Sequence, residues 1–394
     1  MKSVVVNTYL LCLLLRHVTS DTHDETEVAS RHARFWPVGF VRFANSICST
    51  LEGLEGTCYT REQCDGINGG IVSGKCANGI GRCCLVQRTC GSTSSYNNTY
   101  FVNSNYPNGN PAPTQCVYTI RKCNSDICQV RLDFLALSLA QPDGNGYCVT
   151  DSVQVVGGAS TVPIICGENS GQHMYVYFNG DSDIKIIVSA NSIGRSWSIK
   201  VAQIGCDCPW KAPTGCLQYF TSLTGTVNNF NYGTGINGNL VTQNIDGNDQ
   251  PIAVPGTRQM ANENYGVCVQ MQPGYCSIKW SQGSDSTSFT VNNSTALQEA
   301  IRGLPGDPLK GENCTTDYVV VPNPHYTNGT AIDADRFCGN QFIPLVSSSK
   351  PFVLTVVTNK DEVGDVANRG FSLNYEQQAC GTDTSSLSLA LALG

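Results

Sequence analysis

A short pattern occurs twice in this chain and constrains its fold more than any other feature. Cys148 and Asp151 stand three residues apart and are followed by valines at alternate positions, and Cys314 and Asp317 repeat this arrangement. Each copy is followed by a second cysteine and a glycine, at 166–167 and 338–339. Apolar residues at every second position are typical of strands with one buried face, and a repeated pattern indicates repeated units. The sequence therefore predicts two related β domains.

The composition agrees with a β protein that has several domains. The chain has 394 residues, too many for one hydrophobic core. Charged residues make up 14% of it and glycines number 39, which favours turn-rich β structure over long salt-bridged helices. The formal net charge is −7, and Lys and Arg form no cluster. The sequence thus lacks the electrostatic footprint of a protein that binds nucleic acid or an anionic membrane.

Residues 1–20 have the character of a secretory signal peptide. Lys2 precedes an apolar stretch around Tyr9–Leu15, and small residues end the segment at Val18–Ser20. No later segment offers the roughly 20 apolar residues that a membrane span needs. Removal of Cys12 leaves an even number of the 21 cysteines, as full pairing in an oxidising compartment requires. We expect a secreted, extracellular glycoprotein, with acceptor sequons at Asn97, Asn292, Asn293, Asn313 and Asn328.

The segments that flank the domains are polar or short. Residues 21–39 are expected to form a disordered leader, and the run from Arg31 to Arg34 resembles a furin-type processing site that would release a propeptide. Helical signal is confined to about Ala296–Arg302. Residues 381–394 are expected to be a disordered tail. The apolar residues Leu387–Leu393 leave open that a catalytic or anchoring segment follows Gly394.

Six cysteines within residues 40–85 predict a compact module that depends on disulfides. Glycine-rich segments between them favour turns, and three bridges in so small a unit stabilise it by about 2–4 kcal/mol each. A zinc site is disfavoured, because no histidine lies between the cysteines and secretion favours oxidation. The early Gly56-Thr57-Cys58 run and the terminal Cys83-Cys84 doublet resemble the clip domain of arthropod proteins. The resemblance implies the pairs Cys48–Cys83, Cys58–Cys76 and Cys64–Cys84.

From Cys90 onward, short apolar runs at the spacing of a β-sandwich predict strands. Cys90 precedes Asn105-Tyr106-Pro107 and Cys116, and Cys148 precedes Ile165-Cys166-Gly167; with this order, residues 90–204 resemble a CUB domain. That family is a jelly-roll-like sandwich of antiparallel strands. The expected strands are Val117–Ile120, Val130–Phe134, Val153–Val155, Met174–Phe178, Ile184–Val188 and Trp197–Val201, and then Val267–Met271, Ser277–Trp280, Tyr318–Val321, Phe352–Val357 and Phe371–Tyr375.

The CUB resemblance also implies disulfides. In the first domain it implies Cys90–Cys116 and Cys148–Cys166, which leaves Cys123 and Cys128 to staple a local hairpin. Residues 216–380 resemble a diverged CUB repeat, with implied bridges Cys314–Cys338 and Cys216–Cys268. Residues 205–215 form a cysteine-containing linker. No pairing is implied for four further cysteines, which we expect to tie the linker to the second domain: Cys206, Cys208, Cys276 and Cys380.

Many CUB domains bind calcium through three acidic residues, and this chain matches that set incompletely. Asp151 and Asp181 fit two of the positions, but Ala140 stands where a glutamate is expected, with Asp143 as a substitute from the loop. Calcium takes six to eight oxygen ligands, so a missing carboxylate weakens the site. The alternative role for Asp151 is to cap a turn. In the second repeat only Asp317 fits, with Asn359 or Asp361 as the later ligand; no cofactor is required by the sequence.

Catalytic motifs are missing from the sequence. It lacks the glycine-framed serine of trypsin-like proteases, the HExxH zinc motif and a phosphate-binding glycine loop. His173 and His325 are the histidines beyond the leader, and His173 is expected to be packed rather than catalytic. The whole order of segments resembles secreted arthropod CUB proteins without a protease. We therefore expect a non-enzymatic protein that binds an extracellular protein or glycan through its CUB loops; the alternative is a cofactor or regulator of a secreted serine-protease cascade.

Overall fold

The computed structural model describes residues 43, 45–233, 240–245, 248–253, 257–285, 287–291, 308–360, 362 and 368–381. The signal peptide with Cys12, the leader, the expected helix near 296–302, the sequons at Asn292 and Asn293, Asp361 and the residues from 382 onward lie outside this set. Within it, the prediction of a mainly β chain with sandwich domains is confirmed.

A small disulfide-rich module begins the described chain. Its strands are β1 (Ile47–Ser49), β2 (Glu55–Tyr59), β3 (Gly70–Cys76) and β4 (Gly81–Arg88). The helix α1 (Arg61–Asp65) between β2 and β3 was not expected from the sequence. It is nucleated by a capping box, in which the Thr60 hydroxyl accepts from Gln63 N and the Gln63 side chain accepts from Thr60 N. The spacing of Thr60 and Gln63 is the sequence signal that identifies such a helix start.

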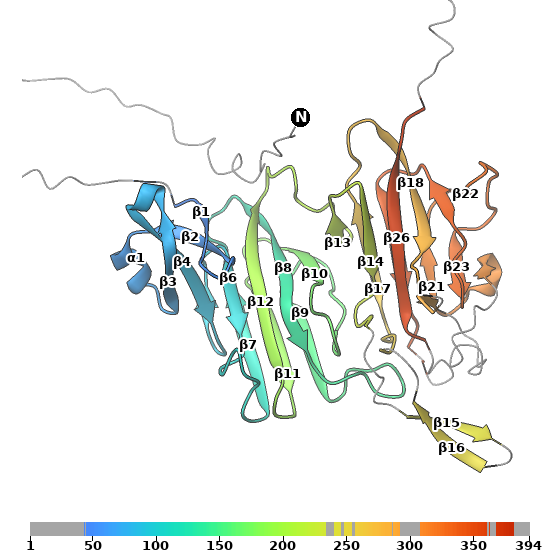
Figure 1. The fold of residues 1–394 in the computed structure, drawn as a ribbon, viewed down its shortest axis with the longest axis horizontal. Coiled ribbons are helices and arrows are strands. Elements are labelled where there is room, and N and C mark those ends of the chain that lie inside the picture. Colours follow the sequence, from blue (N-terminus) through green and yellow to red (C-terminus); the bar gives the residue numbers. More distant parts are fainter. Residues whose placement is uncertain are drawn as a thin grey trace, which may run out of the picture.

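The module shares a sheet with the first sandwich. β4 runs parallel to β6, which places the module's strands in one continuous sheet with the order β1-β2-β4-β6-β12-β8-β10 (Figure 1). The module therefore extends a sheet of the first sandwich and is not an independent domain joined to it by a linker. The strands that the first sandwich contributes are β6 (Thr99–Val102), β8 (Ile127–Ser138), β10 (His173–Tyr177) and β12 (Ser196–Gly205).

The second sheet of the first sandwich has the order β5-β7-β11-β9. Its strands are β5 (Thr93–Ser94), β7 (Thr114–Ile120), β11 (Ile184–Ala190) and β9 (Asp151–Val156). Alternate residues of β7 and β11 are buried, as period-two apolar patterning predicts. Phe101 stacks on Tyr118 with ring centroids 5.1 Å apart, and Trp197 lies beside Phe101, so the rings fill the space between the sheets.

The second sandwich pairs a sheet in the order β13-β17-β25-β21-β23-β20 with another in the order β14-β26-β18-β24-β22, where β19 also pairs with β26. A separate hairpin of β15 and β16 projects from one end (Figure 1). The strands are β13 (Cys216–Phe220), β14 (Thr224–Asn228), β15 (Leu240–Ile245), β16 (Asn248–Ala253), β17 (Asn264–Val269), β18 (Tyr275–Gln282), β19 (Phe289–Thr290), β20 (Pro308–Lys310), β21 (Tyr318–Val320), β22 (Pro324–Tyr326), β23 (Arg336–Gly339), β24 (Leu345–Ser347), β25 (Phe352–Val357) and β26 (Gly370–Ala379).

The disulfides of the structure agree with most of the implied pairs and differ at the linker. Cys123 is not bonded to Cys128; Cys128 bonds Cys206, and Cys123 is a free thiol. Cys206 therefore ties the linker to the first sandwich, and not to the second as expected. Cys276 bonds Cys380 within the second sandwich. The remaining bonds are Cys48–Cys83, Cys58–Cys76, Cys64–Cys84, Cys90–Cys116, Cys148–Cys166, Cys216–Cys268 and Cys314–Cys338.

The two sandwiches are docked side by side through buried polar and apolar contacts. Ala212 of the linker exchanges two hydrogen bonds with the Gln129 side chain, of 3.0 and 3.3 Å. Asn231 N donates to Asn169 Oδ1 across 2.7 Å. Buried apolar side chains of both sandwiches form one contiguous cluster. These contacts fix the relative orientation of the sandwiches, because separating the sandwiches would leave buried polar groups without hydrogen-bond partners.

Candidate functional site

Asp151 is placed at the start of β9 and is completely engaged within the first sandwich. Its side chain is 0% exposed. Oδ2 accepts from Ala140 N at 2.8 Å and lies 2.6 Å from Arg195 Nε, while Oδ1 accepts from Asn191 N at 2.8 Å. One carboxylate thus joins the segment of Ala140 and the loop between β11 and β12 to the start of β9. The turn-capping alternative describes this residue better than the calcium alternative does.

Asp181 lies far from Asp151. It precedes β11, whereas Asp151 pairs with Ala190 at the other end of that strand. Seven residues of extended chain span about 20 Å, so the two carboxylates cannot share one cation. The Asp181 side chain is 98% exposed and forms an ion pair with Lys122 at 3.4 Å. The prediction that Asp151 and Asp181 form one site is therefore wrong.

The first sandwich does not fit a calcium ion at Asp151. The Arg195 guanidinium already supplies the positive charge there, and Ala140 contributes a backbone N–H where a ligand oxygen would be needed. Asp143, the expected substitute, accepts from Asn145 N and Tyr147 N within its own turn. A calcium ion needs six to eight oxygen ligands, and this site presents hydrogen-bond donors in place of them.

Exposed aliphatic side chains gather on the loops that Asp151 holds. Val149 is 62% exposed, Ile193 67% and Ile164 48%. Their segments lie side by side. Asn191 Nδ2 donates to Thr150 O, which connects the segments of Ile193 and Val149, and the Cys148–Cys166 disulfide connects the segments of Val149 and Ile164. We call Val149, Ile164 and Ile193 the loop surface. Apolar side chains exposed together on braced loops are typical of a site that binds a macromolecule.

Comparison with protein families identifies the two sandwiches. The model described as "CUB domain" matches residues 90–200, and the model described as "Animal CUB domain" matches residues 213–378. The chain contains two CUB domains. The linker between the matched ranges includes Cys206 and Cys208. Among curated proteins, none matches this chain.

Three solved structures are similar to parts of this chain at low sequence identity. The MASP-1 CUB2 domain bound to Ca²⁺ is 20% identical, with a TM-score of 0.25, and the match covers 29% of this chain and 98% of that one. The CUB1-EGF-CUB2 domains of rat MASP-1 are 12% identical, with a TM-score of 0.23 and coverage of 72% and 100%. The full extracellular region of zebrafish Gpr126/Adgrg6 is 13% identical, with a TM-score of 0.26 and coverage of 76% and 38%.

The second CUB domain brings two carboxyl groups together at the equivalent place. Asp317 Oδ1 accepts from Asn359 N at 2.8 Å, and Gln259 Nε2 donates to Asp317 Oδ2 at 3.1 Å and to Glu362 Oε1 at 3.3 Å. Burial, opposed by hydrogen bonds that include one from Glu362, raises the pKa of Asp317 to about 6. This pair fits a cation better than Asp151 does. Glu362 was not identified from the sequence, which pointed to Asn359 or Asp361.

The described part of the chain shows no group of three or more His, Cys, Asp and Glu side chains arranged to hold a metal ion. Asp317 and Glu362 supply at most four carboxylate oxygens, and calcium takes six to eight. A cation at this pair would need its remaining ligands from water or backbone carbonyls. In the same part of the chain, no helix has the length and apolar character to cross a bilayer.

His173 lies between the two CUB domains. Its Nε2 is 3.0 Å from Tyr219 O and 3.1 Å from Tyr219 N, and its ring packs edge-on against Phe220 at 4.9 Å. Burial and the nearby positive charge of Arg131 lower its pKa to about 4, against a smaller opposing effect of Asp133. A buried neutral imidazole bonded to backbone is a packing residue of the interface, as the sequence suggested.

His173 makes the stability of the chain sensitive to acid. Because its folded pKa of about 4 lies below the unfolded value of 6.5, the stabilisation is present above pH 6.5 and is lost as the pH falls toward 4. Between pH 7 and pH 5 this group should lower the free energy of unfolding by about 2 kcal/mol. Urea denaturation of wild type and His173→Gln at both pH values measures this difference. His325→Gln is the control; equal pH slopes for wild type and His173→Gln would contradict the assignment.

The described sequons lie in different surroundings. In the second CUB domain, Asn313 is exposed at the end of a short 3-10 helix, Gly311–Asn313, and Asn328 is exposed in a turn, where its Oδ1 accepts from Thr330 N. Asn97 is partly buried and lines a pocket between the N-terminal module and the first CUB domain. Among the described sequons, the structure therefore distinguishes two with an exposed asparagine from one whose asparagine is partly enclosed.

Proposed function

We propose that this chain is a secreted, non-enzymatic binding protein that recognises an extracellular protein through the loop surface of its first CUB domain. CUB domains are extracellular protein-interaction modules without catalytic activity, and both sandwiches belong to that family. The observation that carries the proposal is the exposure of Val149, Ile164 and Ile193 on neighbouring loops. Leaving such side chains in water is unfavourable unless a partner covers them.

The framework beneath the loop surface supports this proposal. Asp151 fastens the segments of Ala140 and Asn191, and Arg195 neutralises its charge without a metal ion. A surface that is already ordered loses little conformational entropy on binding. We infer that recognition at the first CUB domain does not depend on calcium.

Reversal of the polarity of the loop surface tests the proposal. The secreted full chain is cross-linked in its native extracellular fluid, and partners captured by wild type are compared with those captured by Val149→Glu/Ile193→Glu. We expect the double variant to lose about tenfold or more of the specific partner, since two aliphatic side chains at an interface contribute about 1–3 kcal/mol. Leu223→Glu/Met271→Glu is the matched control, because both residues are exposed on the second domain. Equal capture by both variants would contradict the proposal.

A second candidate function uses the N-terminal module. Leu51 is 83% exposed and Ile80 56%, so the module presents apolar side chains of its own. With the module's resemblance to clip domains, this supports a non-catalytic cofactor or regulator that docks a secreted serine protease. A protease among the partners of wild type that is absent with Leu51→Glu/Ile80→Glu, but retained with the loop-surface variant, would favour this candidate.

A further inference from the structure

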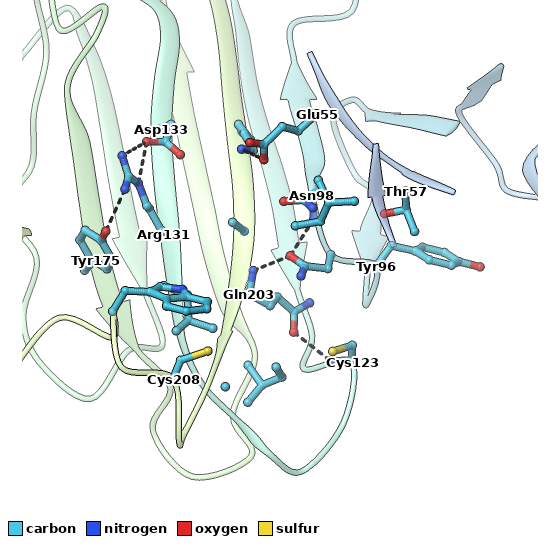
Figure 2. A pocket seen from close by; sticks show the side chains of 18 of the residues that line it. Glu55, Thr57, Tyr96, Asn98, Cys123, Arg131, Asp133, Tyr175, Gln203 and Cys208 are labelled. Atoms are coloured by element: carbon cyan, nitrogen blue, oxygen red, sulfur yellow. Dashed lines mark hydrogen bonds and ion pairs between the residues drawn. The ribbon is translucent and has the colours of Figure 1, made fainter. Parts of the chain in front are cut away.

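A pocket of about 840 Å³ lies between the N-terminal module and the first CUB domain (Figure 2). Its floor is the outward face of the sheet that the module and the domain share, with residues from β2, β8 and β12. A segment before β6 and the linker after β12 also contribute. A volume of this size is typical of pockets that enclose most of a small organic ligand. The lining includes Glu55, Arg131 and Lys200 from these strands, together with Tyr96, Asn97 and Trp210.

Four of the five charged side chains that line the pocket form two ion pairs, and the fifth is Asp126. Lys200 Nζ lies 2.5 Å from Glu55 Oε2, and Arg131 binds Asp133 at 2.7 Å while donating to Tyr175 OH at 2.9 Å. The remaining surface combines amides, hydroxyls and aromatic rings with aliphatic side chains such as Ile47, Ile127 and Leu135. Such a lining suits an uncharged ligand with both hydroxyl groups and apolar faces, which is the chemistry of a carbohydrate.

One lining residue begins an N-glycosylation sequon. Asn97 begins the sequon Asn97-Asn98-Thr99, and its Oδ1 accepts from Gln203 N at 2.7 Å and from Asn98 N at 2.8 Å. These bonds fix the side chain through its oxygen. Its Nδ2, the atom to which an N-linked glycan is attached, makes no hydrogen bond within the described chain. A glycan on Nδ2 would leave both bonds to Oδ1 intact.

The rest of the sequon is closed in the folded protein. Thr99 is 0% exposed, and its hydroxyl is bonded to Tyr118 OH at 2.7 Å inside the sandwich. Because the transferase must reach this hydroxyl, the glycan has to be attached before β6 joins the sheet. The folded chain must then accommodate the sugar beside Asn97, where the pocket lies.

We propose that an N-linked glycan on Asn97 occupies this pocket, with its first sugars packed between the N-terminal module and the first CUB domain. The glycan is then an internal part of the interface, and the sugars on Asn313 and Asn328 extend into solvent. The tether makes the local sugar concentration far higher than that of any free glycan.

Native deglycosylation tests the proposal. The full chain is secreted from a eukaryotic cell line and treated with a peptide N-glycosidase without denaturant, and release at each site is followed by mass spectrometry. We expect Asn97 to be occupied and to lose its glycan about tenfold more slowly than Asn328, because release requires local opening. After denaturation the two rates should match. An unmodified Asn97, or equal rates in the native protein, overturns the proposal.

Two variants show whether slow release of the Asn97 glycan results from its enclosure in the pocket or from slow hydrolysis by the glycosidase. Trp210→Ala removes an aromatic wall and should raise the native release rate at Asn97 toward that at Asn328, whereas Tyr147→Ala, an exposed aromatic outside the pocket, should not. Asn97→Asp keeps the Oδ1 acceptor and removes the sequon; it should fold and bind added N-glycan core oligosaccharide weakly in the emptied pocket. Protection at Asn97 that is unchanged by Trp210→Ala contradicts the placement of the sugar in this pocket.

Discussion

Arg195→Ala should lower the free energy of unfolding by about 3 kcal/mol, because it leaves a carboxylate buried without its counter-charge. The Asp151 side chain is 0% exposed, and the Arg195 side chain 30%. Two backbone N–H groups would remain on Asp151, but they do not neutralise it. Urea denaturation of the full chain, with CUB-domain tryptophan fluorescence as the probe, measures the loss.

A surface ion pair is the matched control for this prediction. Arg121 binds Asp183 at 3.2 Å, with its side chain 63% exposed, so Arg121→Ala should cost about 1 kcal/mol or less. Calcium should not stabilise wild type through Asp151, since the guanidinium occupies the cation's place. A loss with Arg195→Ala no greater than that with Arg121→Ala would show that Asp151 is not held by this pair.

Asp317→Asn should raise the free energy of unfolding above pH 7 by about 3 kcal/mol in calcium-free buffer. The folded pKa of Asp317 is raised to about 6 from 3.8, chiefly by burial. The stability that this group contributes is therefore complete below pH 4 and is lost as the pH rises through 6. An amide keeps the acceptor for Asn359 N and can donate to Glu362, while Gln259 can turn its amide to accept.

The pH dependence of stability and the effect of added calcium show whether ionisation of Asp317 causes the stability difference between Asp317→Asn and wild type. Between pH 4 and pH 6.5 the wild type should lose stability relative to Asp317→Asn, and above that range the difference should be constant. Glu263, whose buried carboxyl also has a raised pKa, contributes equally to both proteins and cancels. If calcium binds Asp317 and Glu362, added calcium will stabilise wild type alone. A variant less stable than wild type in calcium-free buffer at pH 7.5 would contradict the prediction.

Local patterns in the sequence predict eleven strands of the two CUB domains and the domain class, but not the other strands, such as β13 and β14, or the contacts between distant segments. Alternating valines after the repeated cysteines predict β9 and β21. A strand with one buried face can be predicted in this way because its pattern involves only residues that are close in the sequence. Cys128 was assigned to Cys123, a close neighbour in sequence. In the structure, β8 pairs with β12 so that Gln129 faces Ile204, which brings Cys128 beside Cys206. Only that register reveals the bond.

The candidate site shows the same limit. Asp151 was recognised as a key residue, but its partner Arg195 comes from the loop after β11, and the direction of that strand puts Asp181 at the opposite end. Glu362 follows β25 in the second CUB domain, and no sequence pattern pairs it with Asp317. The order and direction of the strands bring charged residues from distant parts of the sequence to the same end of a sandwich. Patterns in a single sequence do not contain this information.

The most direct test of the account is the affinity of the full chain for the partner captured from extracellular fluid, measured by surface plasmon resonance with calcium and with EDTA. We predict that wild type binds equally in both buffers and that Val149→Glu/Ile193→Glu binds at least about tenfold more weakly. Binding that is abolished by EDTA, or that is unaffected by the double substitution, would contradict recognition by a metal-independent loop surface on the first CUB domain.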